Sequence, residues 1–94
     1  MRYVVFYDSA DDVMETAPLH FEAHVEHFTR YLEDGTLERV GTWSDPREGA
    51  MSVLTTRDAA ERFAADDPFV VNGVVRSYRI AEWDEIVTRE ADRP

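Results

Sequence analysis

The chain has 94 residues, no cysteine and a formal net charge of −10 at pH 7. Without cysteine it has no disulfides, thiolate nucleophiles or cysteine-ligated metal centres, and without lysine it has no Schiff-base chemistry. A surface this negative repels phosphate backbones, so we expect no nucleic-acid partner.

The length of the chain predicts one domain, residues 1–87, followed by a charged and flexible tail, residues 88–94. No apolar run approaches the length of a membrane span, and the first residues are too few for a signal peptide. We therefore expect a cytoplasmic protein that does not contact a membrane.

The first half of the chain is predicted to form a strand, a long helix and a second strand. The segment RYVVFYD, residues 2–8, is aromatic and β-branched, which is typical of a buried strand. Thr16 can cap a helix whose first turn contains Pro18, and this helix is expected to stop at Gly35. The second strand is predicted over TLERVGTW, residues 36–43.

The second half is predicted to form a strand, a shorter helix and a long final strand. A turn in SDPREG leads into the strand AMSVLTT. Thr55 or Thr56 caps the helix RDAAERFAAD, which ends at Asp67-Pro68 because the residue before a proline is pushed out of the helical region. The final strand is predicted over residues 74–87.

The order β-α-β-β-α-β is that of the ferredoxin-like fold, an α+β arrangement of a four-stranded antiparallel sheet with both helices on one face. In the first strand Tyr3, Val5 and Tyr7 alternate with Val4 and Phe6, so both faces of the strand are apolar. An uncovered apolar face needs a partner. We therefore expect a homodimer that packs through the open sheet face, as a dimeric α/β barrel.

All three histidines lie on the first predicted helix, in the stretch LHFEAHVEH. On a helical wheel, four apolar residues form the expected core stripe: Phe21, Val25, Phe28 and Leu32. The histidines and Tyr31 border this stripe. Because His24 lies nearest to it, we expect His24 to be the most buried histidine, with His20 and His27 as half-buried boundary residues.

The spacing of the histidines limits metal binding. His20 and His27 are seven residues apart, or about 10 Å along a helix axis, whereas metal–nitrogen bonds are only about 2.0–2.1 Å long. All three side chains therefore cannot meet at one ion. His20 and His24 can chelate a metal as a pair, but a zinc site needs a third ligand and the HExxH motif is absent. Metal binding by this pair stays an alternative.

A second group of candidate residues lies in ADDPFVVNG, residues 65–73. Asp66 and Asp67 are expected at the C-terminal end of the second helix, where the helix macrodipole disfavours a carboxylate. One interpretation is turn chemistry, because Asp-Pro commonly starts a turn. The other is that one aspartate turns toward the first helix and orients a histidine, which makes a general acid/base.

Four segments taken together carry a resemblance to a known family: RYVVFYD, HVEHFTRYLEDGTLERVGTW, AAERFAADDPFVVNGVV and YRIAEW. Over nearly its whole length the chain resembles the YCII-related (YciI-like) family of the dimeric α/β-barrel superfamily. The resemblance implies a ferredoxin-like protomer that dimerises through its sheets. It also implies a cleft with a histidine from the first helix and the aspartate before proline, which by position are His24 and Asp67. His20 and His27 are not part of the family pattern.

The function expected from these residues is that of a small enzyme in which His24 is the general acid/base and Asp67 orients it. Proton abstraction from, or elimination on, a small polar or cyclic metabolite is the expected reaction class. The resemblance implies dehydrochlorination or isomerisation of small ring compounds in a few relatives. No cofactor is needed for this chemistry, and neither a P-loop nor a nucleophile elbow is present. The alternative is a non-catalytic dimeric module that binds a small ligand or assists another enzyme, in which the same pair is a structural hydrogen bond.

Overall fold

The structure, a computed structural model, describes residues 1–89. Its elements in chain order are β1 (Arg2–Ser9), α1 (Val13–Glu33), β2 (Leu37–Thr42), the 3₁₀ helix η1 (Pro46–Glu48), β3 (Ala50–Leu54), α2 (Arg57–Asp66), α3 (Pro68–Val71) and β4 (Val75–Trp83). This is the predicted order with two short helices, η1 and α3, added. Among these elements no helix has both the length and the apolar character needed to cross a membrane.

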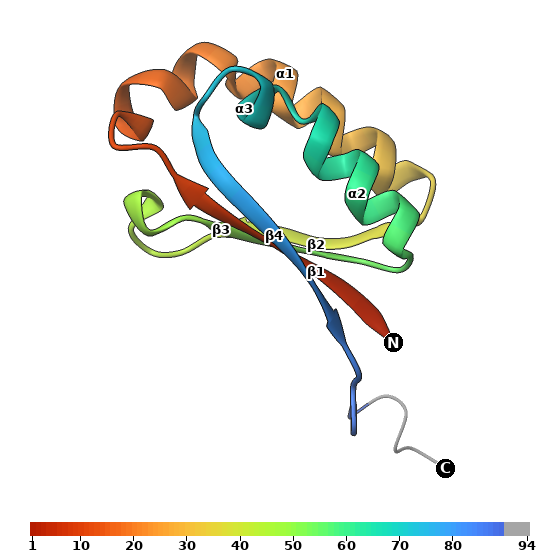
Figure 1. Ribbon diagram of the computed structural model, residues 1–94. Coiled ribbons are helices and arrows are strands. Elements are labelled where there is room, and N and C mark those ends of the chain that lie inside the picture. Colours follow the sequence, from red (N-terminus) through yellow and green to blue (C-terminus); the bar gives the residue numbers. More distant parts are fainter. Residues whose placement is uncertain (90–94) are drawn as a thin grey trace.

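The strands form one antiparallel sheet in the order β2-β3-β1-β4, and α1, α2 and α3 lie on one face of it (Figure 1). β1 is central, because Val5 pairs with Ser52 of β3 and with Ile80 of β4. Val5 and Tyr7 belong to the core, where they meet Phe63 of α2. The predicted ferredoxin-like fold is therefore confirmed.

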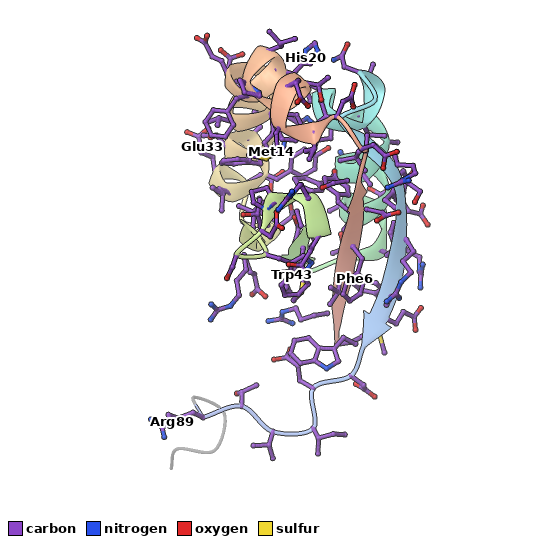
Figure 2. The ribbon with its side chains drawn as sticks, turned by 90° about the vertical axis from the view of Figure 1, so that its left-hand side faces the viewer. Phe6, Met14, His20, Glu33, Trp43 and Arg89 are labelled. Carbon is purple, nitrogen blue, oxygen red and sulfur yellow. The ribbon has the colours of Figure 1, made fainter. Side chains whose placement is uncertain are left out.

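The sheet face away from the helices is also apolar, as the alternation along β1 predicts. Val4 and its partner Val53 are each 5% exposed, and the guanidinium of Arg79 lies 4.1 Å from the centre of the Phe6 ring. In Figure 2, Phe6 and Trp43 lie well away from the labelled residues of α1. The side chain of Phe6 is thus covered by a charged residue of its own sheet rather than by a helix.

α1 begins one turn earlier than predicted, at Val13, with Asp12 rather than Thr16 as its N-cap. Val13 is buried, so the additional turn places an apolar side chain against the core. Pro18 consequently lies inside the helix, where it cannot donate a hydrogen bond to the carbonyl of Met14. Both Pro18 and Met14 are exposed, so this missing hydrogen bond lies at the surface of the helix.

The other helix boundaries agree with the prediction, and the last strand is shorter. Gly35 follows α1 with a φ of +84°, a conformation that favours glycine. Thr56 caps α2, because its hydroxyl oxygen accepts a hydrogen bond from the backbone N–H of Ala59 at 3.1 Å. β4 ends at Trp83, which pairs with the first residue of β1, Arg2, so no further strand is available for pairing. Part of the predicted tail, residues 90–94, lies outside the described residues.

The core face of α1 differs from the predicted stripe. The buried residues of this helix are Val13, His24, His27 and Tyr31. Of the predicted stripe, Phe21 is 56% and Leu32 43% exposed, whereas Phe28 is partly buried and packs against the core. The reason is that a group inside the fold bonds one ring nitrogen of each buried histidine, which lowers the penalty for burial of the imidazole. The prediction that Phe21 and Leu32 belong to the core face is wrong.

Candidate functional site

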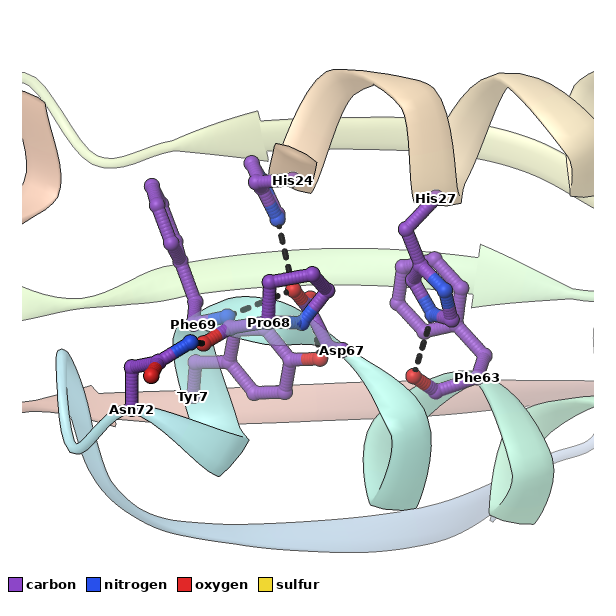
Figure 3. Close-up of polar contacts among 8 residues, drawn as sticks. All are labelled: Tyr7, His24, His27, Phe63, Asp67, Pro68, Phe69 and Asn72. Carbon is purple, nitrogen blue, oxygen red and sulfur yellow. Dashed lines mark hydrogen bonds and ion pairs between the residues drawn. The ribbon is translucent and has the colours of Figure 1, made fainter. Parts of the chain in front are cut away.

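The two residues predicted to form a site, His24 and Asp67, are in direct contact. Nδ1 of His24 on α1 lies 2.8 Å from Oδ1 of Asp67, which links α2 to α3 (Figure 3). His24 is 9% exposed and Asp67 is fully buried. The two helices therefore bring together residues that are 43 positions apart in the chain.

Asp67 is the centre of a small network of hydrogen bonds. Its Oδ2 accepts a hydrogen bond from the hydroxyl of Tyr7 at 2.7 Å, and its Oδ1 accepts one from the backbone N–H of Phe69 at 3.0 Å. The second bond makes Asp67 the N-cap of α3, a position that favours a carboxylate. The expected conflict with the macrodipole of α2 is thus offset by α3. Turn formation and contact with the histidine are both roles of this one side chain.

The hydrogen bonds determine the charge of this network. Burial by itself raises the pKa of Asp67, but the hydrogen bond and charge of His24, with the donors Phe69 and Tyr7, outweigh it and lower the pKa below the ordinary value of 3.8. Burial raises the pKa of Tyr7 well above its ordinary range, so its hydroxyl stays protonated and donates. Asp67 is therefore an ionised acceptor at neutral pH, and Nδ1 of His24 must carry the proton that they share.

The other nitrogen of His24, Nε2, has no hydrogen-bond partner among residues 1–89. In the same part of the chain, every fully buried side-chain nitrogen or oxygen has a hydrogen-bond partner. Because Nε2 has none, it is not fully buried and is therefore accessible. The ring of His24 stacks on Phe69 with centroids 3.8 Å apart and planes within 5°, and meets the edge of Phe28 at 5.2 Å. Packing and hydrogen bonding therefore hold the imidazole in one orientation.

His24 lines a cavity of about 330 Å³ between α1 and the sheet. The aromatic rings of Phe21, Phe28 and Phe69 form much of its wall, and Ser9 and Ser52 contribute hydroxyl groups. Its volume is near the lower end of the range for small-molecule sites, about 300–1,000 Å³. The geometry therefore offers a fixed imidazole with one available nitrogen at the wall of a small, mainly apolar cavity.

The family model of the YCII-related domain matches residues 1–84. The chain belongs to the YCII-related family. The membership predicted from the four sequence segments is thereby confirmed. No curated protein sequence matches the chain significantly.

One solved structure with a similar fold is that of 5-chloro-2-hydroxyhydroquinone dehydrochlorinase (TftG) from Burkholderia phenoliruptrix AC1100, in complex with 2,5-dihydroxybenzoquinone. The TM-score is 0.71, and the match covers 89% of this chain and 94% of that chain. The two sequences are 15% identical. At this identity the similarity establishes a shared fold.

Of the other two histidines of this YCII-related protein, His27 differs from the predicted burial and His20 agrees with it. His27 is 3% exposed and thus more buried than His24, so the predictions that His24 is the most buried and His27 a boundary residue are wrong. Nε2 of His27 donates a hydrogen bond to the backbone carbonyl of Phe63 at 2.8 Å and thereby ties α1 to α2 (Figure 3). His20 is half-buried, as expected.

The metal alternative needs a third ligand near His20 and His24. Within residues 1–89, no group of three histidine, cysteine, aspartate or glutamate side chains is arranged to hold a metal ion. Nδ1 of His24 is already bonded to Asp67. The described part of the YCII-related chain thus supplies no third ligand for this pair.

Sequence reasoning missed two members of the site, Tyr7 and Phe69. The signal for Tyr7 was present, because a tyrosine on the core-facing side of a buried strand needs a partner for its hydroxyl. Its partner, Asp67, is 60 positions away, and only the folded chain identifies it. Phe69 follows the Asp-Pro pair directly, so its N–H is the expected partner of an Asx turn, but its stacking on His24 has no sequence signal.

Proposed function

We propose that this YCII-related protein is an enzyme in which His24 is the general acid/base and Asp67 orients it. The observation that carries the proposal is the asymmetry of the imidazole. One nitrogen is bonded to a fully buried carboxylate, and the other is accessible at a cavity of about 330 Å³. A base must present an unprotonated nitrogen to its substrate, and a carboxylate at Nδ1 leaves Nε2 in that state.

In the proposed reaction Nε2 takes a proton from a carbon or oxygen of the bound molecule, and the resulting imidazolium is stabilised by the ionised Asp67. In an elimination, the leaving group departs with its own electron pair from a saturated carbon, such as that of the keto tautomer of a chlorinated phenol. The electron pair of the broken C–H or O–H bond forms the new double bond, directly or through conjugation. In an isomerisation, His24 returns the proton to another atom. Both proposed reactions use only side chains of the protein and need no cofactor.

Elimination, dehydrochlorination or isomerisation of a small cyclic molecule is the reaction class that we propose. Two observations support it. The cavity is walled by aromatic side chains that suit a flat ring, and the fold is similar to that of a dehydrochlorinase solved with a quinone.

The experiment is to compare wild-type protein with His24→Gln and with the matched control His20→Gln on chlorinated and hydroxylated benzene rings, following chloride release and ultraviolet absorbance. We expect turnover of at least one ring by the wild-type protein. We expect a loss of about 10²–10⁴-fold in the His24 variant and none in the control, because His20 does not line the cavity. Undiminished turnover by His24→Gln would contradict the proposal.

A second candidate function, a non-catalytic ligand-binding module, is favoured by the structural role of Asp67. Its bonds join β1, α1 and α3, so the pair also supports the fold. Binding of aromatic rings, seen as shifts of backbone NMR signals around the cavity, combined with the absence of any turnover would favour this second function over the first.

We also propose that two copies of the chain associate through the open sheet face. Val4, Phe6, Met51 and Val53 share this face, and Trp83 in β4 is 50% exposed. Sedimentation at micromolar concentration is expected to give twice the chain mass of 10.9 kDa. Phe6→Glu should give single chains, and Met14→Glu, an exposed position on α1, should remain a dimer. A wild-type mass equal to one chain would contradict the dimer.

A further inference from the structure

Ser52 is a buried polar residue with an unused hydrogen-bonding group. It lies in β3, on the helix-facing side of the sheet, between Val5 of β1 and Val40 of β2, and it is 3% exposed. Its hydroxyl makes no hydrogen bond to any residue in the described chain. Every fully buried polar side-chain atom in this part of the chain has a partner, so the Ser52 hydroxyl, which has none, is accessible. Ser52 lines the same cavity as His24.

The other buried hydroxyl groups of the cavity are already occupied. The hydroxyl of Ser9 donates to the backbone carbonyl of Pro46 at 2.7 Å, and that of Tyr7 donates to Asp67 at 2.7 Å. A hydroxyl in an apolar wall destabilises the fold unless it finds a partner. The hydroxyl of Ser52 makes no such bond within the described part of the chain, so the cavity is where it can find a partner.

The charge of the cavity wall narrows the kind of partner. None of the described side chains that line the cavity is an arginine, and the chain as a whole carries a formal charge of −10. Carboxylate or phosphate groups would therefore enter the cavity without an arginine or lysine to pair with. Aromatic walls and neutral hydroxyl groups instead suit a flat, neutral ring with oxygen substituents.

We propose that Ser52 is the second polar anchor of the ligand, and that the cavity takes a flat ring with at least two oxygen substituents. One oxygen lies at Nε2 of His24 and the other accepts from, or donates to, the hydroxyl of Ser52, while Phe28 and Phe69 contact the ring. Serine serves both a hydroxyl and a carbonyl substituent, because its hydroxyl is donor and acceptor. This inference rests on the proposed function for the ligand atom at His24, but it concerns binding and not turnover.

The test uses matched rings, the three benzenediols and the three methylphenols, in which a methyl group replaces one hydroxyl at the same position. Dissociation constants are measured by NMR titration without oxygen for wild-type protein, Ser52→Ala and the control Ser77→Ala, an exposed serine of β4. We expect at least one diol to bind wild-type protein about three- to tenfold more tightly than its methylphenol, the effect of one hydrogen bond. The preference should disappear in Ser52→Ala and persist in Ser77→Ala.

Thermal unfolding tests whether Ser52 has a structural role instead. If its hydroxyl has no partner in the protein, Ser52→Ala should have a Tm equal to or above that of the wild-type protein. A Tm lowered by more than about 5 °C, a diol preference that survives in Ser52→Ala, or no binding of any ring at millimolar concentration would each overturn the inference. Loss of the preference in Ser52→Ala together with full turnover by His24→Gln would reject the catalytic proposal and keep this one.

Discussion

His24 and His27 lie three residues apart on the same face of α1, and both are less than 10% exposed. They differ in the group that each contacts. His24 is bonded at Nδ1 to the carboxylate of Asp67, whereas His27 donates from Nε2 to the neutral backbone carbonyl of Phe63. A carboxylate stabilises an imidazolium much better than a carbonyl does. Burial therefore does not distinguish a candidate catalytic histidine from a structural one, but the charge of its partner does.

Access to the cavity is the second difference between the two histidines. His24 lines the cavity, and its second nitrogen is available. His27 does not line it, and its ring packs between Tyr31 at 5.1 Å and Phe63 at 5.4 Å. The same helix face thus carries one imidazole that can meet a ligand and one that connects two helices.

The largest expected effect comes from removal of the charge at the partner of His24. Asp67→Asn keeps the shape of the side chain, but its amide can donate to Nδ1 and leave the proton of His24 on Nε2, where a base must be unprotonated. We expect turnover of the substrate found for the wild-type protein to fall about 10²–10⁴-fold, as for tautomer errors in histidine-dependent enzymes.

The control for this substitution is the neighbouring Asp66→Asn, which changes an exposed carboxylate outside the cavity and should retain wild-type turnover. Circular dichroism should show that both variants are folded. Equal turnover by Asp67→Asn and wild-type protein would show that the negative charge of Asp67 does not matter to His24. A carboxylate partner would then not distinguish His24 from His27.

The next effect concerns His27 and stability. His27→Ala removes a buried ring and its hydrogen bond between α1 and α2, so we expect the free energy of unfolding to fall by about 2–4 kcal/mol. Urea denaturation measures this loss. The half-buried His20→Ala, with no hydrogen bond to lose among the described residues, should change it by less than about 0.5 kcal/mol. If both variants lost the same small amount, His27 would not be the structural member of the pair.

Local sequence patterns predicted the fold well because its boundaries depend on local chemistry. Helices begin or end at Thr56, Gly35 and the Asp67-Pro68 pair because of the backbone and side-chain properties of these residues themselves. The burial of His27 was not predictable in this way, because its partner carbonyl lies 36 positions away in the chain. A helical wheel sorts residues by polarity alone and placed the imidazoles at the border of the core.

The candidate site was predicted in part. The pairing of His24 with Asp67 followed from the family resemblance together with the packing of two helices on one sheet face, and the two side chains are in contact. The network around the pair was not foreseen, because Tyr7 comes from β1, which meets Asp67 only in the folded sheet. Their roles in catalysis remain the proposal that the variants test.

A smaller effect is expected when the carboxylate of Asp67 loses its donor on β1. Tyr7→Phe removes the hydroxyl that Asp67 accepts from and keeps the ring that stacks on Phe63. We expect the free energy of unfolding at neutral pH to fall by about 1.5–3 kcal/mol, the range for a hydrogen bond to a charged group. Tyr78→Phe is the matched control, because the hydroxyl of Tyr78 has no hydrogen bond within residues 1–89. An unchanged stability of Tyr7→Phe would show that the bond contributes nothing.

The acid dependence of stability gives the smallest and most specific contrast. The folded pKa of Asp67 lies below its ordinary value of 3.8, so its contribution is complete above that value and is lost as the pH falls through the folded pKa, at no more than about 1.4 kcal/mol per pH unit. Tyr7→Phe removes one of the donors that lower the pKa of Asp67, so the folded pKa should move back toward 3.8. The pH range over which this contribution is lost should then keep its upper limit and become narrower. Asp67→Asn should abolish the contribution of this group.

Urea denaturation between about pH 2 and 5 measures the stability of the three proteins, and the difference between wild type and Asp67→Asn isolates Asp67 from the other carboxylates. Identical acid dependence in all three would mean that Asp67 is not held in its ionised form, and His24 would then lose the feature that separates it from His27.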